Sequence, residues 1–297
     1  LRFCLSGRDG VLRLWADSGD AWTTQTSGIG AFLAVGNDPY SLQEQGAAAV
    51  MHHLKTGRLR KEKPLPDFID FFGWCTWDAF YKNVSEPDVM RGMKSFAEGG
   101  PVPKFVILDD GWLSVQKEPG DGVRLVDFKA NEKFPGGLSN MIRRIKSEYN
   151  VECFMVWHAV MGYWAGVDKE RYAKYGVRDI PRNDMPPFGR DMGLVFCWMG
   201  TMCGVIPPEN IAEFYDDFHK FLASEGVDGV KVDNQSSIEL STYGTGGRVS
   251  LSHAYRNGLE KSCRRNFTGR LINCMSGSTE MYLMADDSNI MRTSDDF

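Results

Sequence analysis

The chain has 297 residues, of which 42% are hydrophobic and 25% are charged, and its formal net charge is -5. This length and composition fit one large globular domain or two smaller ones. Charges are mixed without a basic stripe, and no apolar run approaches the ~18–20 residues of a membrane span, which argues against nucleic acid or membrane partners.

The first segment predicts an antiparallel β domain. Residues 1–37 contain three apolar runs separated by Gly and Asp: LRFCLSG, VLRLWADSG and TTQTSGIGAFLAVG. Asp38 followed by Pro39 then predicts a helix start, over a periodic segment that ends at Gly57. Residues 38–70 therefore hold a helix and a charged, proline-containing linker.

From residue 71 onward, short apolar runs alternate with amphipathic segments. The runs are FFGWCTW (71–77), KFVILDDGW (104–112), VECFMVWHAV (151–160), GVDGVKVD (226–233), RLINCMS (270–276) and NIMRTSDD (289–296). Periodic segments between them predict helices, one of them capped by Ser85. The alternation predicts an α/β fold in which residues 71–297 supply six of the eight strands of a (β/α)8 TIM barrel. Residues 161–206 are too long for a simple connection and predict an insertion after the third strand.

Polar or aromatic side chains stand at the end of every predicted strand. They include Trp74, Asp109, Asp110, Trp112, His158, Lys231, Asp233, Arg292, Asp295 and Asp296. Because the carboxyl ends of barrel strands converge on one face, we expect these side chains to surround a single charged pocket.

Lys231 and Asp233 are two residues apart, so both side chains lie on the same face of their strand. An ammonium group beside a carboxylate favours its ionised form, which suits a nucleophile or a fixed negative charge. The alternative is structural: Asp233 would cap the following turn and form a salt bridge with Lys231.

Two further acidic pairs allow more than one role. Asp109-Asp110-Gly-Trp112 fits a β-turn, a site for vicinal sugar hydroxyls with Trp112 shaping the pocket, or a hard-cation site. The run 292–296 fits a helix cap or a second catalytic carboxyl group. A retaining glycosidase needs two carboxyl groups ~5–5.5 Å apart.

His158 and Cys274 are ambiguous. A histidine at a strand end fits a hydrogen-bonded wall residue or a base. Cys274 fits core packing or the pocket wall rather than a nucleophile, because no activating base accompanies it in the sequence. The seven cysteines are scattered without a C-x-x-C pair. This pattern predicts neither a disulfide framework nor a zinc site, and it favours a reducing, cytoplasmic compartment.

Five motifs carry a family resemblance: GWCTWDAFY, FVILDDGW, VWHAVMGYW, GVKVD and RTSDDF. In this order and spacing they resemble the raffinose synthase and seed imbibition branch of glycoside hydrolase family 36, which includes alkaline α-galactosidases. The resemblance covers residues 1–297. It implies that residues 1–37 end an N-terminal β-sandwich domain and that 71–297 form most of the catalytic barrel.

The resemblance also implies roles for individual residues. Asp233 matches the nucleophile of the family's K-x-D motif, and Asp296 matches the acid/base of its R-x-x-x-D motif. The other carried-over or strand-end residues would bind substrate: Trp74, Asp109, Asp110, Trp112, His158, Lys231, Arg292 and Asp295. The implied chemistry is a retaining double displacement on α-galactosides such as raffinose-family sugars.

The acceptor is left open by this resemblance. Leu113 and Asn234 depart from the usual plant pattern near the pocket, and either water or a sugar can receive the galactosyl group. The first alternative is therefore a galactosyltransferase of the raffinose synthase type. Both need an oligosaccharide or α-galactoside as partner, and neither needs a metal or an organic cofactor.

The second alternative is a metal-dependent barrel enzyme that acts on a carbon acid. In it, Asp109, Asp233 and Asp295 would bind Mg²⁺, and Lys231 would act as the base.

Overall fold

The computed structural model describes residues 2–25, 27, 29, 32–117, 122–182 and 200–294. Its centre is a six-stranded parallel sheet in the order β12-β11-β10-β7-β4-β3, so that these strands lie side by side in the order of the chain. The strands are β3 (Gly73–Cys75), β4 (Phe105–Leu108), β7 (Cys153–Ala159), β10 (Gly229–Asp233), β11 (Leu271–Asn273) and β12 (Ile290–Met291). All six predicted strands are confirmed, and the sheet is part of a TIM barrel.

Both faces of the central strands β7 and β10 are buried, which explains why these strands are apolar runs without alternation. On the outer face, Val106, Val156 and Val232 belong to a large core cluster with the helices. On the inner face, Ile107 and Met155 pack in a smaller cluster with Phe68 and other apolar side chains.

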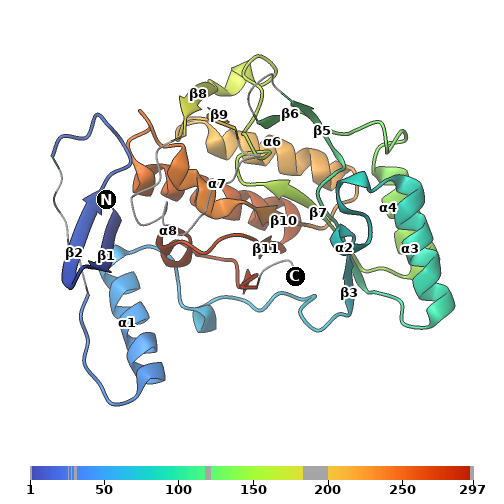
Figure 1. The fold of residues 1–297 in the computed structure, drawn as a ribbon. Helices are drawn as coiled ribbons and strands as arrows, with labels where there is room; N and C mark the ends of the chain where they lie inside the picture. Colours follow the sequence, from blue (N-terminus) through green and yellow to red (C-terminus); the bar gives the residue numbers. More distant parts are fainter. Residues whose placement is uncertain are drawn as a thin grey trace.

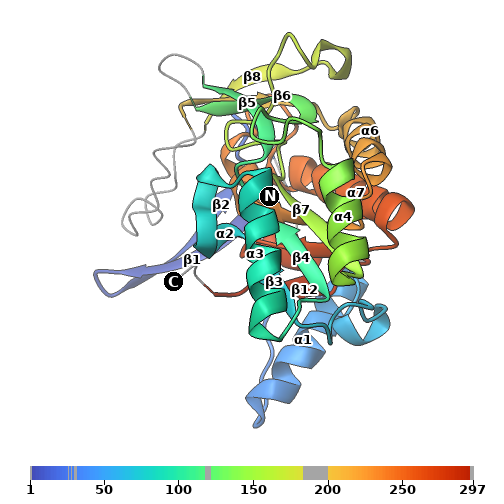
Figure 2. The same cartoon turned by 90° about the vertical axis from the view of Figure 1, so that its right-hand side faces the viewer.

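Four long helices cover the outer face: α3 (Glu86–Gly99), α4 (Ser139–Tyr149), α6 (Ile211–Ser224) and α7 (Arg248–Phe267). Figure 1 shows α6 and α7 side by side across the sheet, and Figure 2 shows α3 beside α4 over β3 and β4. These helices lie where the periodic segments predicted them. Ser85 is the N-cap residue of α3, but its hydroxyl donates to Asp88 and accepts no backbone N–H, so it does not cap the helix as expected.

The N-terminal segment forms a hairpin and a helix. Strands β1 (Arg2–Arg8) and β2 (Val11–Asp17) pair antiparallel through a turn at Asp9 and Gly10, both with positive φ, as a tight hairpin requires. The third strand expected within 23–36 does not form in the part of that stretch the structure describes. Helix α1 (Pro39–Leu54) begins as predicted, with Asp38 accepting two backbone N–H groups. That the hairpin ends a β-sandwich domain stays a prediction.

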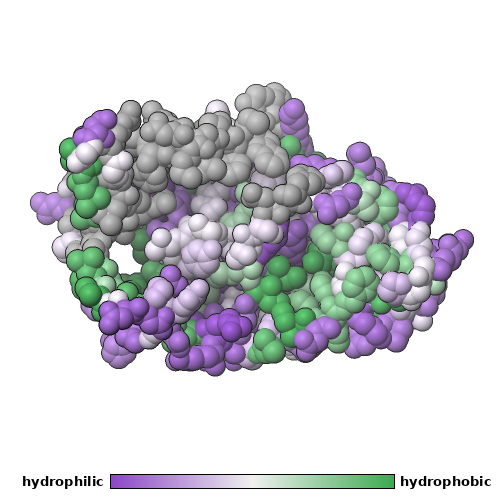
Figure 3. Space-filling view, turned by 60° about the horizontal axis from the view of Figure 1, so that its bottom comes forward, coloured by the Kyte–Doolittle hydropathy of each residue, from purple (hydrophilic) through white to green (hydrophobic). Residues whose placement is uncertain are grey.

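The linker after α1 is fixed to the barrel. It contains the short 3-10 turn η1 (Arg60–Glu62) and passes the loop before β12, where Lys63 donates to the carbonyl of Ser288 at 2.8 Å. Figure 3 views the molecule with its bottom forward and shows hydrophobic surface (green) beside hydrophilic surface (purple). The exposed apolar side chains that lead into β3 include Leu65, Ile69 and Phe72.

Two hairpins extend from the carboxyl ends of the strands. Strands β5 (Leu113–Lys117) and β6 (Val123–Ala130) follow β4 and were not predicted. Strands β8 (Arg178–Pro181) and β9 (Met202–Val205) lie within the predicted insertion and pair antiparallel. Within this insertion the backbones of Gly166 and Gly204 pair directly. They are so close that a Cβ on Gly166 would lie 2.1 Å from the carbonyl oxygen of Gly204.

The remaining short helical elements lie in the connections that follow the strands. They are α2 (Trp77–Phe80), η2 (Tyr81–Asn83), η3 (Ala173–Tyr175), η4 (Gln235–Leu240) and α8 (Thr279–Leu283). In the described part of the chain, no helix is both long and apolar enough to cross a membrane.

Candidate active site

The carboxyl ends of β4, β7, β10 and β12 meet at a cavity of about 390 Å³. It is lined by five of the predicted residues: Asp109, Asp110, Lys231, Asp233 and Arg292. Lys231 is in register with Trp157, and Asp233 with Ala159, so alternate residues of these neighbouring strands face the same side. The expected convergence of charged strand ends is therefore what the structure shows for these five residues.

Asp233 is buried, and two N–H donors orient its carboxylate. Trp157 Nε1 donates to Oδ2 at 2.9 Å, and the backbone N–H of Asn234 donates to Oδ1 at 2.7 Å. Asn234 has φ 60°, a left-handed conformation that Asn tolerates well, so the chain can turn directly after β10. Each oxygen keeps lone-pair capacity, so the carboxylate is fixed in direction while remaining able to attack a substrate atom.

Lys231 forms its ion pair with Asp109. Its Nζ lies 2.6 Å from Asp109 Oδ2, with both side chains nearly fully buried. Burial acts to lower the pKa of Lys231, but the Asp109 carboxylate outweighs it and holds that pKa above its ordinary value. The expectation that Lys231 forms a salt bridge with Asp233 is therefore wrong: its ammonium group pairs with Asp109 and so links β10 to the end of β4, on the other side of β7.

Asp110 is held by residues of the insertion and of η2. Tyr163 donates to Oδ1 at 2.7 Å, Trp164 Nε1 donates to Oδ2 at 3.0 Å, and the Lys82 ammonium lies 3.4 Å from Oδ2. Burial raises the pKa of Asp110, although these three groups act against the rise. The turn explanation is also correct, because the adjacent Gly111 has φ 122°.

Three predicted substrate-binding residues do not reach the cavity. Trp74 faces outward, with its ring 5.4 Å from that of Phe96. Trp112 is fully buried and donates to the carbonyl of Trp157. His158 is fully buried, and its Nε2 lies 3.2 Å from Nε2 of His219 on α6. Trp74 and His158 occupy strand positions whose side chains face the helices, and Trp112 is buried in the core. The prediction that these three residues line the cavity is therefore wrong.

Asp295 and Asp296 lie outside the described residues, so the second catalytic carboxyl group stays a prediction. Arg292, three residues before Asp295, lines the cavity and donates to Cys274 Sγ at 3.5 Å.

Four aromatic residues line the cavity without having been assigned a site role: Trp77, Trp157, Trp164 and Tyr282. For Trp157 the sequence offers half of the signal: Trp157 and His158 must face opposite sides of β7, so only one of them can lie on the side of Lys231, but the uniformly apolar run does not say which. Tyr282 gives no comparable signal, because it stands on the short helix α8 outside any predicted element.

Cys274 is fully buried and does not line the cavity, so of the two expected roles, packing and pocket wall, the structure supports packing. Burial, followed by the charge of Asp233, raises the pKa of the Cys274 thiol to about 12, so it is protonated at neutral pH and a poor nucleophile. Among the described residues, no group of three or more His, Cys, Asp or Glu side chains is arranged to hold a metal ion. The proposed triad of the metal-dependent alternative includes Asp295, which lies beyond these residues.

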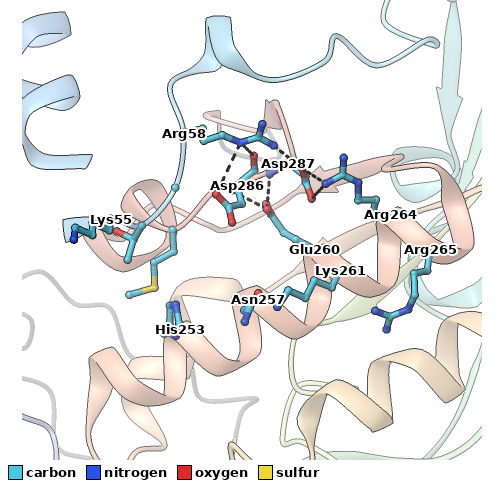
Figure 4. Close-up of a pocket in the computed structure, with 13 residues that line it drawn as sticks. Lys55, Arg58, His253, Asn257, Glu260, Lys261, Arg264, Arg265, Asp286 and Asp287 are labelled. Carbon is cyan, nitrogen blue, oxygen red and sulfur yellow. Dashed lines mark hydrogen bonds and ion pairs between the residues drawn. The ribbon is translucent and has the colours of Figure 1, made fainter. Parts of the chain in front are cut away.

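A second cavity, of about 450 Å³, lies between the linker and α7 (Figure 4). Its acidic groups are used within the protein: Asp287 Oδ1 is 2.7 Å from Arg58 and 3.1 Å from Arg264. The Glu260 carboxylate accepts the backbone N–H groups of Asp286 and Asp287. These contacts join the linker, α7 and the loop before β12. We therefore interpret the side chains around this cavity as structural contacts between these three segments.

Comparison with known proteins places the chain in context. All of its residues, 1–297, match the family model described as raffinose synthase or seed imbibition protein Sip1. It is 38% identical to probable galactinol–sucrose galactosyltransferase 6 of Arabidopsis thaliana, covering 100% of this chain and 42% of that protein. It is 37% identical to probable galactinol–sucrose galactosyltransferase 1 of the same plant, covering 96% of this chain and 42% of that protein. The chain therefore spans less than half the length of these relatives.

Among solved structures, the chain is similar to an α-galactosidase from Thermus thermophilus crystallised with stachyose. The TM-score is 0.50 at 18% identity, over 84% of this chain and 48% of that one. At this identity the likeness concerns the fold, and it supports the assignment of the six strands to a barrel.

Proposed function

Because the chain belongs to the raffinose synthase and seed imbibition protein family, we propose that it is the catalytic core of a retaining enzyme acting on α-galactosides. The whole protein would hydrolyse α-galactosides such as raffinose-family sugars, or transfer their galactosyl group to a sugar. The observation that carries the proposal is the cavity in which Asp233, Asp109, Asp110 and Lys231 meet.

In this mechanism Asp233 attacks the anomeric carbon. The bond from that carbon to an Asp233 oxygen forms as the bond to the leaving oxygen breaks, and a carboxylic acid protonates the leaving oxygen. Trp157 and the Asn234 N–H support the role of Asp233, since they hold its two oxygens in one orientation.

Asp296 is proposed as the acid, with Arg292 orienting it or holding a substrate hydroxyl and Asp295 beside it. In the second step the same group takes a proton from water or from an acceptor hydroxyl, which attacks the anomeric carbon and releases Asp233. Asp109, Asp110 and Lys231 would hold the hydroxyl groups of the galactosyl ring, because fixed charges and donors select a polyhydroxylated ligand.

The proposal is tested by incubating the protein with an aryl α-galactoside and with raffinose, each with and without sucrose as acceptor. We expect free galactose, a transfer product, or both. The absence of release and of transfer would refute the proposal. Loss of activity with EDTA would instead favour the metal-dependent alternative, in which the carboxylates bind Mg²⁺.

A further inference from the structure

Tyr282 stands on the rim of the same cavity whose floor carries Asp233. As a whole residue Tyr282 is 46% exposed, whereas Asp109, Lys231 and Asp233 as whole residues are at most 8% exposed. Its hydroxyl makes no hydrogen bond to the part of the chain that the structure describes. An exposed aromatic ring with an available hydroxyl therefore borders a buried set of charges.

The helix that carries Tyr282 is firmly anchored. Ser278 caps α8 by accepting the backbone N–H of Met281, and Met281 is buried in the main core cluster. On the other side, the backbone of Leu283 touches Gly57 so closely that a Cβ there would lie 2.5 Å from the Leu283 carbonyl oxygen. The Tyr282 ring is thus presented to the cavity by a segment that packs on both sides.

The two ends of the cavity differ in chemistry. The floor is charged, which suits the hydroxyl groups of the galactosyl ring. The part of the lining that comes from the segment between β11 and α8, just before Tyr282 in the chain, is uncharged: it consists of Met275, the buried Ser276 and the exposed Gly277. An uncharged aromatic rim suits the C–H face of a second ring, and the tyrosine hydroxyl can bind one of its hydroxyl groups.

We infer that Tyr282 is a specificity-determining residue that binds the ring of the leaving group or acceptor, a sugar or cyclic polyol. This inference rests on the proposed function. During transfer, the acceptor oxygen forms a bond to the anomeric carbon, the bond from that carbon to Asp233 breaks, and the acceptor proton moves to the carboxylate that serves as base. Stacking on Tyr282 holds the acceptor ring during this step and competes with attack by water.

The test compares two donors in Tyr282→Ala. Raffinose carries a leaving group with rings, whereas α-galactosyl fluoride carries none. We expect the KM for raffinose to rise about tenfold more than the KM for the fluoride, which corresponds to about 1.4 kcal/mol. Where sucrose serves as acceptor, its half-saturating concentration for transfer should rise by a similar factor.

Two further variants keep the test decisive. Tyr282→Phe retains the ring and should show less than a third of the effect. Tyr243→Ala removes a tyrosine that is 45% exposed and does not line the cavity, and should show none. Equal KM changes for both donors in Tyr282→Ala would overturn the inference while the proposed function stands. Failure of the unaltered protein to act on either donor would overturn both.

Discussion

Replacing Lys231 by Met removes the cation from a buried ion pair and leaves the Asp109 carboxylate without it. The two side chains are 10% and 4% exposed, and Nζ lies 2.6 Å from Oδ2. At this distance the attraction is about 6 kcal/mol for an effective dielectric constant of about 20. Part of it offsets the burial of both charges, so we expect the free energy of unfolding to fall by about 3–5 kcal/mol.

The loss of unfolding free energy arises because the Asp109 carboxylate is left buried without its partner. A second variant that also removes this carboxylate tests that cause. In Lys231→Met/Asp109→Asn no buried charge is stranded, and we expect less than half of the loss. Lys61→Met serves as the control, because Lys61 and Glu44 form an ion pair of similar length whose side chains are 66% and 60% exposed. The control should change the unfolding free energy little.

Urea denaturation followed by tryptophan fluorescence measures these differences. The reasoning is refuted if Lys231→Met unfolds at the same urea concentration as the unaltered protein. It is equally refuted if the double variant is as unstable as the single one.

The other predictions concern the site and its support. Trp157→Phe removes a hydrogen bond to Asp233 and should lower kcat/KM for an aryl α-galactoside by roughly 10–100-fold, from about 1.5–3 kcal/mol for a bond to a charged group; a change under twofold would contradict this. Burial lowers the pKa of His158 from 6.5 to about 4, so the unfolded state binds a proton first as the pH falls. Between pH 6.5 and 4 the free energy of unfolding should therefore decrease by about 3 kcal/mol from this group, and His158→Phe should flatten that slope in urea titrations. Gly166→Ala places a Cβ 2.1 Å from the Gly204 carbonyl at φ 81° and should lower Tm by an amount equivalent to more than about 1 kcal/mol; an unchanged Tm would show that the insertion adapts.

The strands could be predicted because each is an apolar run bounded by turn residues, and helices with clear periodicity separate them. The direction of side chains could not be predicted in the same way. Both faces of a barrel strand are buried, so the run 153–159 has no polar alternation to show that Trp157 faces the cavity and His158 faces α6.

Side-chain contacts between segments far apart in the chain could not be predicted from the sequence either. Lys231 has an acidic neighbour two residues away, yet it pairs with Asp109, 122 residues earlier. Only the register of β4, β7 and β10 brings those two side chains together. The same holds for Tyr163 and Trp164, whose hydrogen bonds to Asp110 depend on how the insertion folds back over the strand ends.

The central claim is that Asp233 is the covalent nucleophile. The most direct measurement uses a fluorinated α-galactosyl fluoride that forms the glycosyl enzyme faster than water releases it, followed by peptide mass spectrometry. The account predicts one galactosyl label on the peptide that carries Asp233, and none in Asp233→Asn. A label on another carboxylate, or galactoside hydrolysis that persists in Asp233→Asn, would contradict it.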